Sequence, residues 1–315
     1  MPAVRVEIPA GHATFVTAQP LTRAGFALFG DVIANPRPGR VPSLPAVAVP
    51  AAHTTTSTTS TTTPPSSSAA AVGASHATTP PAAAFAPVSA NQGSATKYQH
   101  VAGPRNLYSQ APSRVPAQQI VSLFVCSARR LEGYPAAGTA RSEGRRKSEG
   151  PAGLVLAGDA PESGGGDAAT TRDCFVVEIL ERHPFTTQMF VPLGTTPGGR
   201  YLVIVAPSLP PSPVDEALPV PNAADGGELP GRGLPDLRGL SAFVATADQA
   251  VSYGAGTWHA PMVALGPEGT TVDFVVVQAA NGVGIEDCQE VVFASEGRTR
   301  PEVVVRVPLP RVAKL

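Results

Sequence analysis

The chain has 315 residues, of which 43% are hydrophobic and 15% charged, and 23 basic against 24 acidic side chains leave a net charge of −1. This balance, without a long run of Lys or Arg, excludes the dense positive surface that nucleic-acid binding requires. No apolar run approaches the roughly 20 residues of a membrane span. The amino terminus also lacks the basic start and apolar core of a secretory signal, so we expect an intracellular protein that has neither nucleic acid nor a membrane as its partner.

The three cysteines argue against two kinds of covalent scaffold. Cys126, Cys174 and Cys288 are odd in number and form no CxxC pair, so neither a disulfide framework nor a structural zinc site is indicated. We expect each to be a reduced, small apolar residue in or beside a strand.

The first predicted element is a short amphipathic helix within Pro20 to Ile33. Thr22 stands where a helix cap is expected, Phe26 and Phe29 fall on or near one helical face, and Gly30 ends the pattern. No other segment predicts a long helix.

Three stretches interrupt the remaining pattern, at residues 41–90, 132–171 and 207–235. They are rich in Pro, Gly, Ser, Thr, Ala or charge and have no hydrophobic periodicity. Such segments bury too little apolar surface to offset their ordering entropy. We therefore expect a single domain over 1–315 that carries long disordered insertions, the last two being surface loops that can be deleted at little cost in stability.

Short β-rich runs make up most of the rest. Most are four to eight residues long, rich in Val, Ile and Phe, and bounded by turn residues, which is typical of an antiparallel sandwich or small barrel. Together they predict a mostly β fold of the jelly-roll or cupin-like barrel type, with a pocket at the barrel mouth. The runs are 120–126, 174–180, 188–191, 201–206, 240–246, 249–253, 272–279, 290–294 and 303–307.

Polar residues that a strand core does not need gather in three segments. In NQGSATKYQH, Asn91 and Gly93 suit a turn with exposed backbone N–H groups, and Lys97 adds a cation; an ordinary turn with a solvated lysine fits as well. ERHPFTTQMFVPLG carries His183 and Gln188, and VSYGAGTWHAPMVAL carries the only Trp, followed by a His. Each pattern alone also fits core or surface residues.

In order and spacing, six strings of this sequence resemble the blocks of one family. The strings are LTRAGFALFGDVI, NQGSATKY, ERHPFTTQMFVPLG, YLVIVA, VSYGAGTWHAP and VDFVVV, and the family is that of the ureidoglycolate lyases. The resemblance implies a cupin-like enzyme of purine and allantoin catabolism that releases urea from ureidoglycolate and leaves glyoxylate, without a cofactor. It also implies a homodimer. Bacterial members tend to carry Arg where this chain has Lys97.

The resemblance assigns roles to residues of the three segments. Losing urea requires a base for the hydroxyl proton, an acid for the departing nitrogen, and donors that hold the carboxylate. His183 and His259 would be the acid and base, in either order, and Gln188 would pair with the ureido group. The substrate-binding residues would be Asn91, Gly93 and Lys97 at the carboxylate, Trp258 as an apolar wall, and Tyr98 and Tyr253 at the rim.

Two alternatives remain open on the sequence. A metal-dependent cupin oxygenase or isomerase is disfavoured because Gln188 stands where an anionic ligand would be wanted, so we expect no metal site. A non-catalytic cupin that binds a small acid would not need the two histidines. Ala313, Lys314 and Leu315 resemble a peroxisomal address, so the expected location is cytoplasmic or peroxisomal.

Overall fold

The computed structural model describes residues 4–8, 13–42, 87–133, 172–194, 198–222, 229, 231–295 and 302–308. Most of the first two expected insertions and the last three residues lie outside these ranges. Among the described residues, none of the helices has the length or the apolar character that crossing a bilayer requires.

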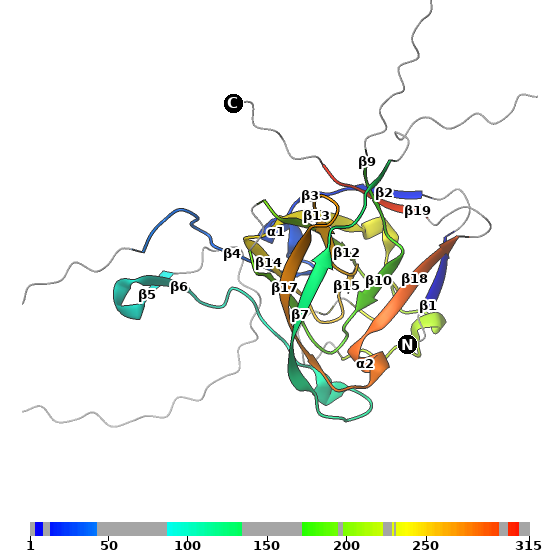
Figure 1. Cartoon of the computed structure of the whole chain (residues 1–315). Helices are drawn as coiled ribbons and strands as arrows, with labels where there is room; N and C mark the ends of the chain where they lie inside the picture. The colour runs from blue at the N-terminus through cyan, green and yellow to red at the C-terminus, as the bar shows by residue number, and fades with distance from the viewer. Residues whose placement is uncertain are drawn as a thin grey trace, which may run out of the picture.

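The largest sheet has eight strands (Figure 1). Across it follow β1 (Val4–Ile8), β18 (Gln289–Ser295), β10 (Ile179–Arg182), β15 (Trp258–His259), β12 (Arg200–Ala206), β13 (Ser241–Thr246) and β3 (Gln19–Pro20), while β16 (Val263–Leu265) pairs with β12. The early strand β1 pairs in parallel with β18, where Val4 lies beside Val291. Likewise, β3 pairs in parallel with β13, where Gln19 lies beside Phe243.

Smaller sheets complete the fold. The five-stranded sheet runs β4 (Gly30–Ala34), β14 (Gln249–Tyr253), β11 (Gln188–Pro192), β17 (Thr271–Ala280) and β7 (Gln118–Ser127). The four-stranded sheet runs β2 (Ala13–Thr17), β19 (Glu302–Arg306), β9 (Arg172–Val176) and β8 (Glu132–Gly133), and β5 (Pro87–Ala90) pairs only with β6 (Ala95–Tyr98). The described residues contain two short α-helices, α1 (Arg23–Phe26) and α2 (Gly284–Asp287). The mostly β, cupin-like prediction is therefore confirmed, although these sheets stay open instead of closing into one barrel.

The core is divided between the two faces of the eight-stranded sheet. On β12, Tyr201 and Val203 pack with residues of the five-stranded sheet, whereas Leu202 and Ile204 pack with residues of the four-stranded sheet. Successive side chains of a strand point to opposite faces. The strand is therefore covered on both sides, which explains why YLVIVA is apolar without interruption.

All nine predicted runs contain strands, but two segments differ from the expectation. The run 174–180 is split between β9 and β10, which belong to different sheets. The predicted helix is shorter than expected: Thr22 caps it by accepting a hydrogen bond from Gly25 N, and β4 starts at Gly30. A Cβ on Gly30, whose φ is +145°, would lie 2.0 Å from the carbonyl oxygen of Ser252, so glycine allows β4 to run against β14.

The described part of 207–235 is packed against the body, contrary to the expectation of a dispensable surface loop. Asp215 and Leu218 are buried within it. The carbonyl oxygens of Gly231, Arg232 and Gly233 accept hydrogen bonds from the Arg182 guanidinium. Because these bonds satisfy most of a buried cation, removing the segment would leave the Arg182 guanidinium with only its hydrogen bond to Gln289 among the described residues.

Candidate active site

A cavity of about 280 Å³ opens between the eight-stranded and five-stranded sheets. Its polar side chains come from strands of both sheets or from the turn that follows β10, and apolar side chains close the remaining wall. The lining residues are Ser122, Phe124, Glu181, His183, Gln188, Phe190, Pro261, Met262, Val276 and Gln278.

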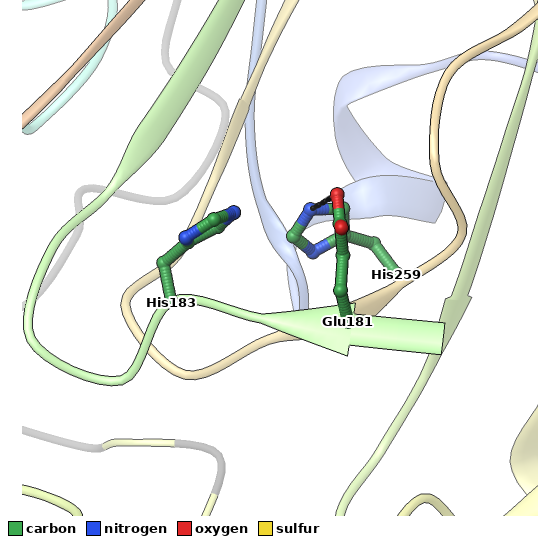
Figure 2. A group of neighbouring side chains, drawn as sticks. All are labelled: Glu181, His183 and His259. Carbon is green, nitrogen blue, oxygen red and sulfur yellow. Dashed lines mark ion pairs between the residues drawn. The ribbon is translucent and has the colours of Figure 1, made fainter. Parts of the chain in front are cut away.

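Strand register brings Glu181 and His259 together. They are directly opposite one another in the antiparallel pair of β10 and β15, and such residues project on the same face of a sheet. Glu181 Oε1 lies 3.6 Å from His259 Nε2, and the dashed line in Figure 2 marks this pair. His183 follows β10 two residues after Glu181, and its ring lies 5.6 Å from that of His259 between centroids.

The backbone fixes the tautomer of His183. Its Nδ1 is 2.6 Å from the carbonyl oxygen of Asp287; because a carbonyl only accepts, Nδ1 carries the proton and Nε2 keeps a lone pair. This Nε2 is buried and has no hydrogen-bond partner among the described residues. The carbonyl is itself held in place, since the Asp287 carboxylate accepts hydrogen bonds from Tyr108 Oη and Asn281 N.

His259 is held in the same tautomer. Its Nδ1 donates to the carbonyl of Thr257 at 2.8 Å, and Tyr253 stacks on the ring at 4.0 Å between centroids. His259 Nε2 keeps a lone pair and lies next to Glu181 and Gln188, which line the cavity. Gln188 Oε1 lies 3.1 Å from this Nε2, in the orientation in which Gln188 Nε2 donates to Gln278 Oε1 at 2.6 Å. Because this oxygen and the His259 lone pair both accept, Gln188 can donate to His259 Nε2 only when both glutamine amides are turned over. A half turn about its last torsion makes an amide a donor or an acceptor toward a given neighbour.

Burial sets the charges of these groups. It is the main cause that raises the pKa of Glu181 to about 7, with help from Glu290, and that lowers the pKa of His259 to about 3, with help from His183. Burial also lowers the pKa of His183. At neutral pH both imidazoles are therefore uncharged, and Glu181 exists in both protonation states. When protonated, it is positioned to donate to His259 Nε2.

The opposite face of the same two strands holds a different pair. Arg182, which is fully buried, stacks over the Trp258 ring at 4.4 Å, and the Trp258 indole N–H donates to the Gly233 carbonyl. Burial lowers the pKa of Arg182 to about 9. Trp258 belongs to the core on this side and does not line the cavity. It is therefore not the apolar wall that the sequence suggested.

The expected carboxylate-binding residues are not brought to the cavity. Asn91, Gly93, Lys97 and Tyr98 lie on the hairpin of β5 and β6, which projects from the body, cyan in Figure 1. None of them lines the cavity. Of the other sequence-predicted residues, His183 and Gln188 line it, His259 lies behind Gln188 and Glu181, and Tyr253 stacks on the His259 ring.

The site also contains residues that sequence reasoning missed. Glu181, Gln278 and Asp287 were not among the expected functional residues. A signal for Glu181 exists, because alternate residues at the end of a strand share a face and His183 is two residues away. No sequence signal connects Asp287 to His183, since they meet only through the packing of α2.

The side chains of Glu181, His183 and His259 fit a divalent cation. Their ligand atoms lie within 4.8 Å of one another, and two imidazoles with one carboxylate are a set that several transition metals accept. The sequence argument against a metal rested on a missing acidic ligand near Gln188. That premise is wrong, because Glu181 supplies the carboxylate.

Comparisons with known proteins agree with the motifs. The ureidoglycolate lyase family matches residues 13–300. Ureidoglycolate lyase of Schizosaccharomyces pombe is 40% identical over 116 residues, 36% of this chain and 48% of that protein. Ureidoglycolate lyase of Saccharomyces cerevisiae is 39% identical over 102 residues, which are 32% of this chain and 40% of that protein. Ureidoglycolate lyase of Burkholderia mallei is 37% identical over 103 residues, which are 33% of this chain and 43% of that protein. The matches span about half or less of each relative. The family match covers most of this chain, which therefore belongs to the ureidoglycolate lyase family.

Proposed function

We propose that this protein is a ureidoglycolate lyase that releases urea and leaves glyoxylate. The observation that carries the proposal is the convergence of a carboxyl group and two imidazole lone pairs, from Glu181, His183 and His259, at a small cavity in a chain of this family. Ureidoglycolate is a carbinolamine whose carbon holds a hydroxyl, a carboxylate and a urea nitrogen. Its collapse needs one proton acceptor and one proton donor, but neither a nucleotide nor a covalent nucleophile.

Proton transfer can be assigned to individual groups. His183 Nε2 has no partner among the described residues and is the acceptor for the hydroxyl proton. As the C=O bond forms, the C–N bond breaks, and its electron pair takes the proton that Glu181 and His259 share. Gln188 and Gln278 offer amides to the ureido group. Glu181, His183 and His259 would hold a divalent cation through the same lone pairs, so a bound cation would replace proton acceptance by His183 and would instead polarise the hydroxyl oxygen.

The proposal extends to the assembly and the location of the protein. We propose a homodimer, and a cytoplasmic or peroxisomal location. An amino-terminal fluorescent fusion, imaged with and without the last three residues, tests the peroxisomal address. An unchanged diffuse signal in both would exclude it.

The direct test is a coupled assay for glyoxylate and urea. Purified protein should produce both in equal amounts from ureidoglycolate, and the His183→Ala, His259→Ala double variant should not. Tight binding of ureidoglycolate without turnover would support a small-acid-binding protein instead. Oxygen uptake without urea release would support a cupin oxygenase.

The metal site is tested by the effect of cation binding on thermal stability. Zn²⁺ or Mn²⁺ should raise the melting temperature of EDTA-treated protein by mass action, and the shift should vanish in Glu181→Gln. Glu178→Gln, an exposed change three residues earlier, is the matched control and should keep the shift. An equal shift in both variants would show that the cation binds elsewhere.

A further inference from the structure

Strand β7 leaves one edge and one face of the five-stranded sheet uncovered among the described residues. It is the last strand of that sheet and pairs with β17 alone. Three alternate apolar residues point outward from it: Val121, Leu123 and Val125 are 66%, 63% and 62% exposed. A free edge next to exposed apolar side chains is a surface that folded proteins normally cover.

The apolar face continues across the neighbouring strands. By register, Leu123 lies beside Val275 of β17, which in turn lies beside Val191 of β11. Met189 and Val277 adjoin them on the same face and are half-buried, like Val191 and Val275. The opposite face of β7 carries Ser122 and Phe124 into the cavity wall. Whatever covers this apolar face therefore also lies close to the rim of the cavity.

Among the described residues, the β5–β6 hairpin packs on little besides itself. Two strands alone are marginally stable in water, yet this hairpin forms its own sheet and projects from the body (Figure 1). The connector is short: four residues separate Tyr98 from Gly103, whose N–H donates to the Asp31 carboxylate. The arm is thus held away from the cavity of its own chain.

The tip of the hairpin has the features of an anion site. Asn91, Gln92 and Gly93 have φ values of 48°, 56° and 93° in succession, so their N–H groups lie in a tight turn, and Lys97 follows on β6. The residues that line the cavity include Glu181, His183 and Gln188 but neither Lys nor Arg. In the described part of the chain, no cation lines this candidate site for a carboxylate substrate, whereas an exposed arm carries one.

We propose that a second copy of this chain covers the outer face of β7, and that each copy inserts its β5–β6 hairpin at the cavity of the other. The active site is then composite, with Glu181, His183 and His259 from one chain and Lys97 and the Asn91–Gly93 turn from its partner. The anionic ligand rests on the proposed function, whereas the exchange of arms rests on the surfaces alone.

The surface is tested by sedimentation without any assay. The wild-type chain should sediment as a dimer at micromolar concentration, and Leu123→Asp should sediment as a monomer with an unchanged circular dichroism spectrum. Leu28→Asp is the matched control, because Leu28 is 89% exposed in the turn between α1 and β4; it should remain a dimer. A monomeric wild type, or a Leu123→Asp dimer of unchanged affinity, overturns the proposal.

Exchange of the arms is tested by cross-linking two tagged chains of different mass. One carries Lys97→Cys and the other Ser122→Cys, and a short bismaleimide should join them into a mixed covalent dimer. Wild-type chains give the background from the native cysteines, and Leu28→Cys with Ser122→Cys is the negative pair. Because this readout needs no turnover, it still decides the exchange if the lyase activity is absent. No mixed product above background overturns the exchange.

Complementation then tests the composite site. Equal amounts of Lys97→Ala and His183→Ala chains are denatured and refolded together. Half of the dimers are mixed, and each mixed dimer holds one intact site, so kcat/KM should reach about one quarter of the wild-type value. If each arm served its own chain, the mixture would reach only about one twentieth, given a loss of roughly tenfold for Lys97→Ala. The lower value in an active enzyme overturns the composite site.

Discussion

The two regions that the sequence motifs single out are built in opposite ways. On β10 and β15, neighbouring strands fix the side chains: Glu181 and His259 lie on the cavity side while Arg182 and Trp258 face the core. On the β5–β6 hairpin, the candidate residues stand on an arm that, within the described ranges, forms a two-stranded sheet of its own. The first region is complete within one chain. The second carries a lysine and a turn suited to an anion but lies away from the cavity of its own chain. A sequence motif can therefore mark a site that forms only between two chains.

The largest effect is expected from the histidines. His183→Ala or His259→Ala should each lower kcat by roughly 10²- to 10⁴-fold, the usual scale for losing a general acid or base. The matched control is His100→Asn at the base of the hairpin, since Asn tolerates the φ of 56° there. Steady-state kinetics and circular dichroism measure the outcome. Wild-type kcat in a folded His183→Ala protein would remove this group from the mechanism.

The next effect concerns the core side of the same strands. Arg182→Met should destabilise the protein by roughly 2–5 kcal/mol, because the Gln289 amide and the carbonyls of residues 231–233 lose a buried partner. Denaturant unfolding measures this. Arg238→Met removes an arginine whose side chain is 85% exposed and should change stability little. Equal losses in both variants would mean that the buried contacts of Arg182 have no net effect.

A pH-dependent effect is expected from Glu181 in the metal-free protein. Burial raises its pKa to about 7 from 4.5, so the folded state favours the protonated form, and stability is lost as pH rises from about 4.5 to about 7. Glu181→Gln should therefore gain up to about 3 kcal/mol relative to wild type between pH 4 and pH 8. Urea unfolding in EDTA at several pH values checks this. A difference that does not change with pH would contradict the buried carboxyl.

The smallest effect is expected on the arm. Lys97→Ala should raise KM by about tenfold with little change in kcat, since an anchor for a carboxylate acts in the ground state as well as in the transition state. Lys97→Arg should keep or lower KM, because a guanidinium binds carboxylate bidentately. Thr96→Ala, the neighbour on the same strand, is the control and should leave KM unchanged. A loss in kcat alone would place Lys97 in the chemical step.

Local sequence patterns predicted the strands well because the side chains of each strand reflect which of its faces are buried. YLVIVA is apolar throughout, since β12 has a core on both faces. The break between β9 and β10 was not predictable, because both halves are apolar and the change of sheet depends on tertiary packing. The same holds for residues 207–235, whose composition resembles a free loop although its carbonyls serve a buried Arg182.

Residue identity predicted part of the site, and packing decided the rest. His183, Gln188 and His259 stand out in the sequence because a β core does not need them, and the structure brings them together. Trp258 stands next to His259 in the sequence but on the other face of the strand, so adjacency along the chain was misleading. Glu181 escaped notice because an acidic residue at a strand end is ordinary, and only its register opposite His259 makes it unusual.

The pairing of β1 with β18 and of β2 with β19 limits how early these strands can enter a sheet during synthesis. Strand β2 pairs with β19, whose residues 302–306 are made almost 290 residues later, an interval of roughly 15 to 60 s at about 5–20 residues per second. During that time the first strands have open edges and no sheet to join. Since pairings so distant along the chain form slowly, we expect β1 and β2 to need protection by chaperones until β18 and β19 have left the ribosome.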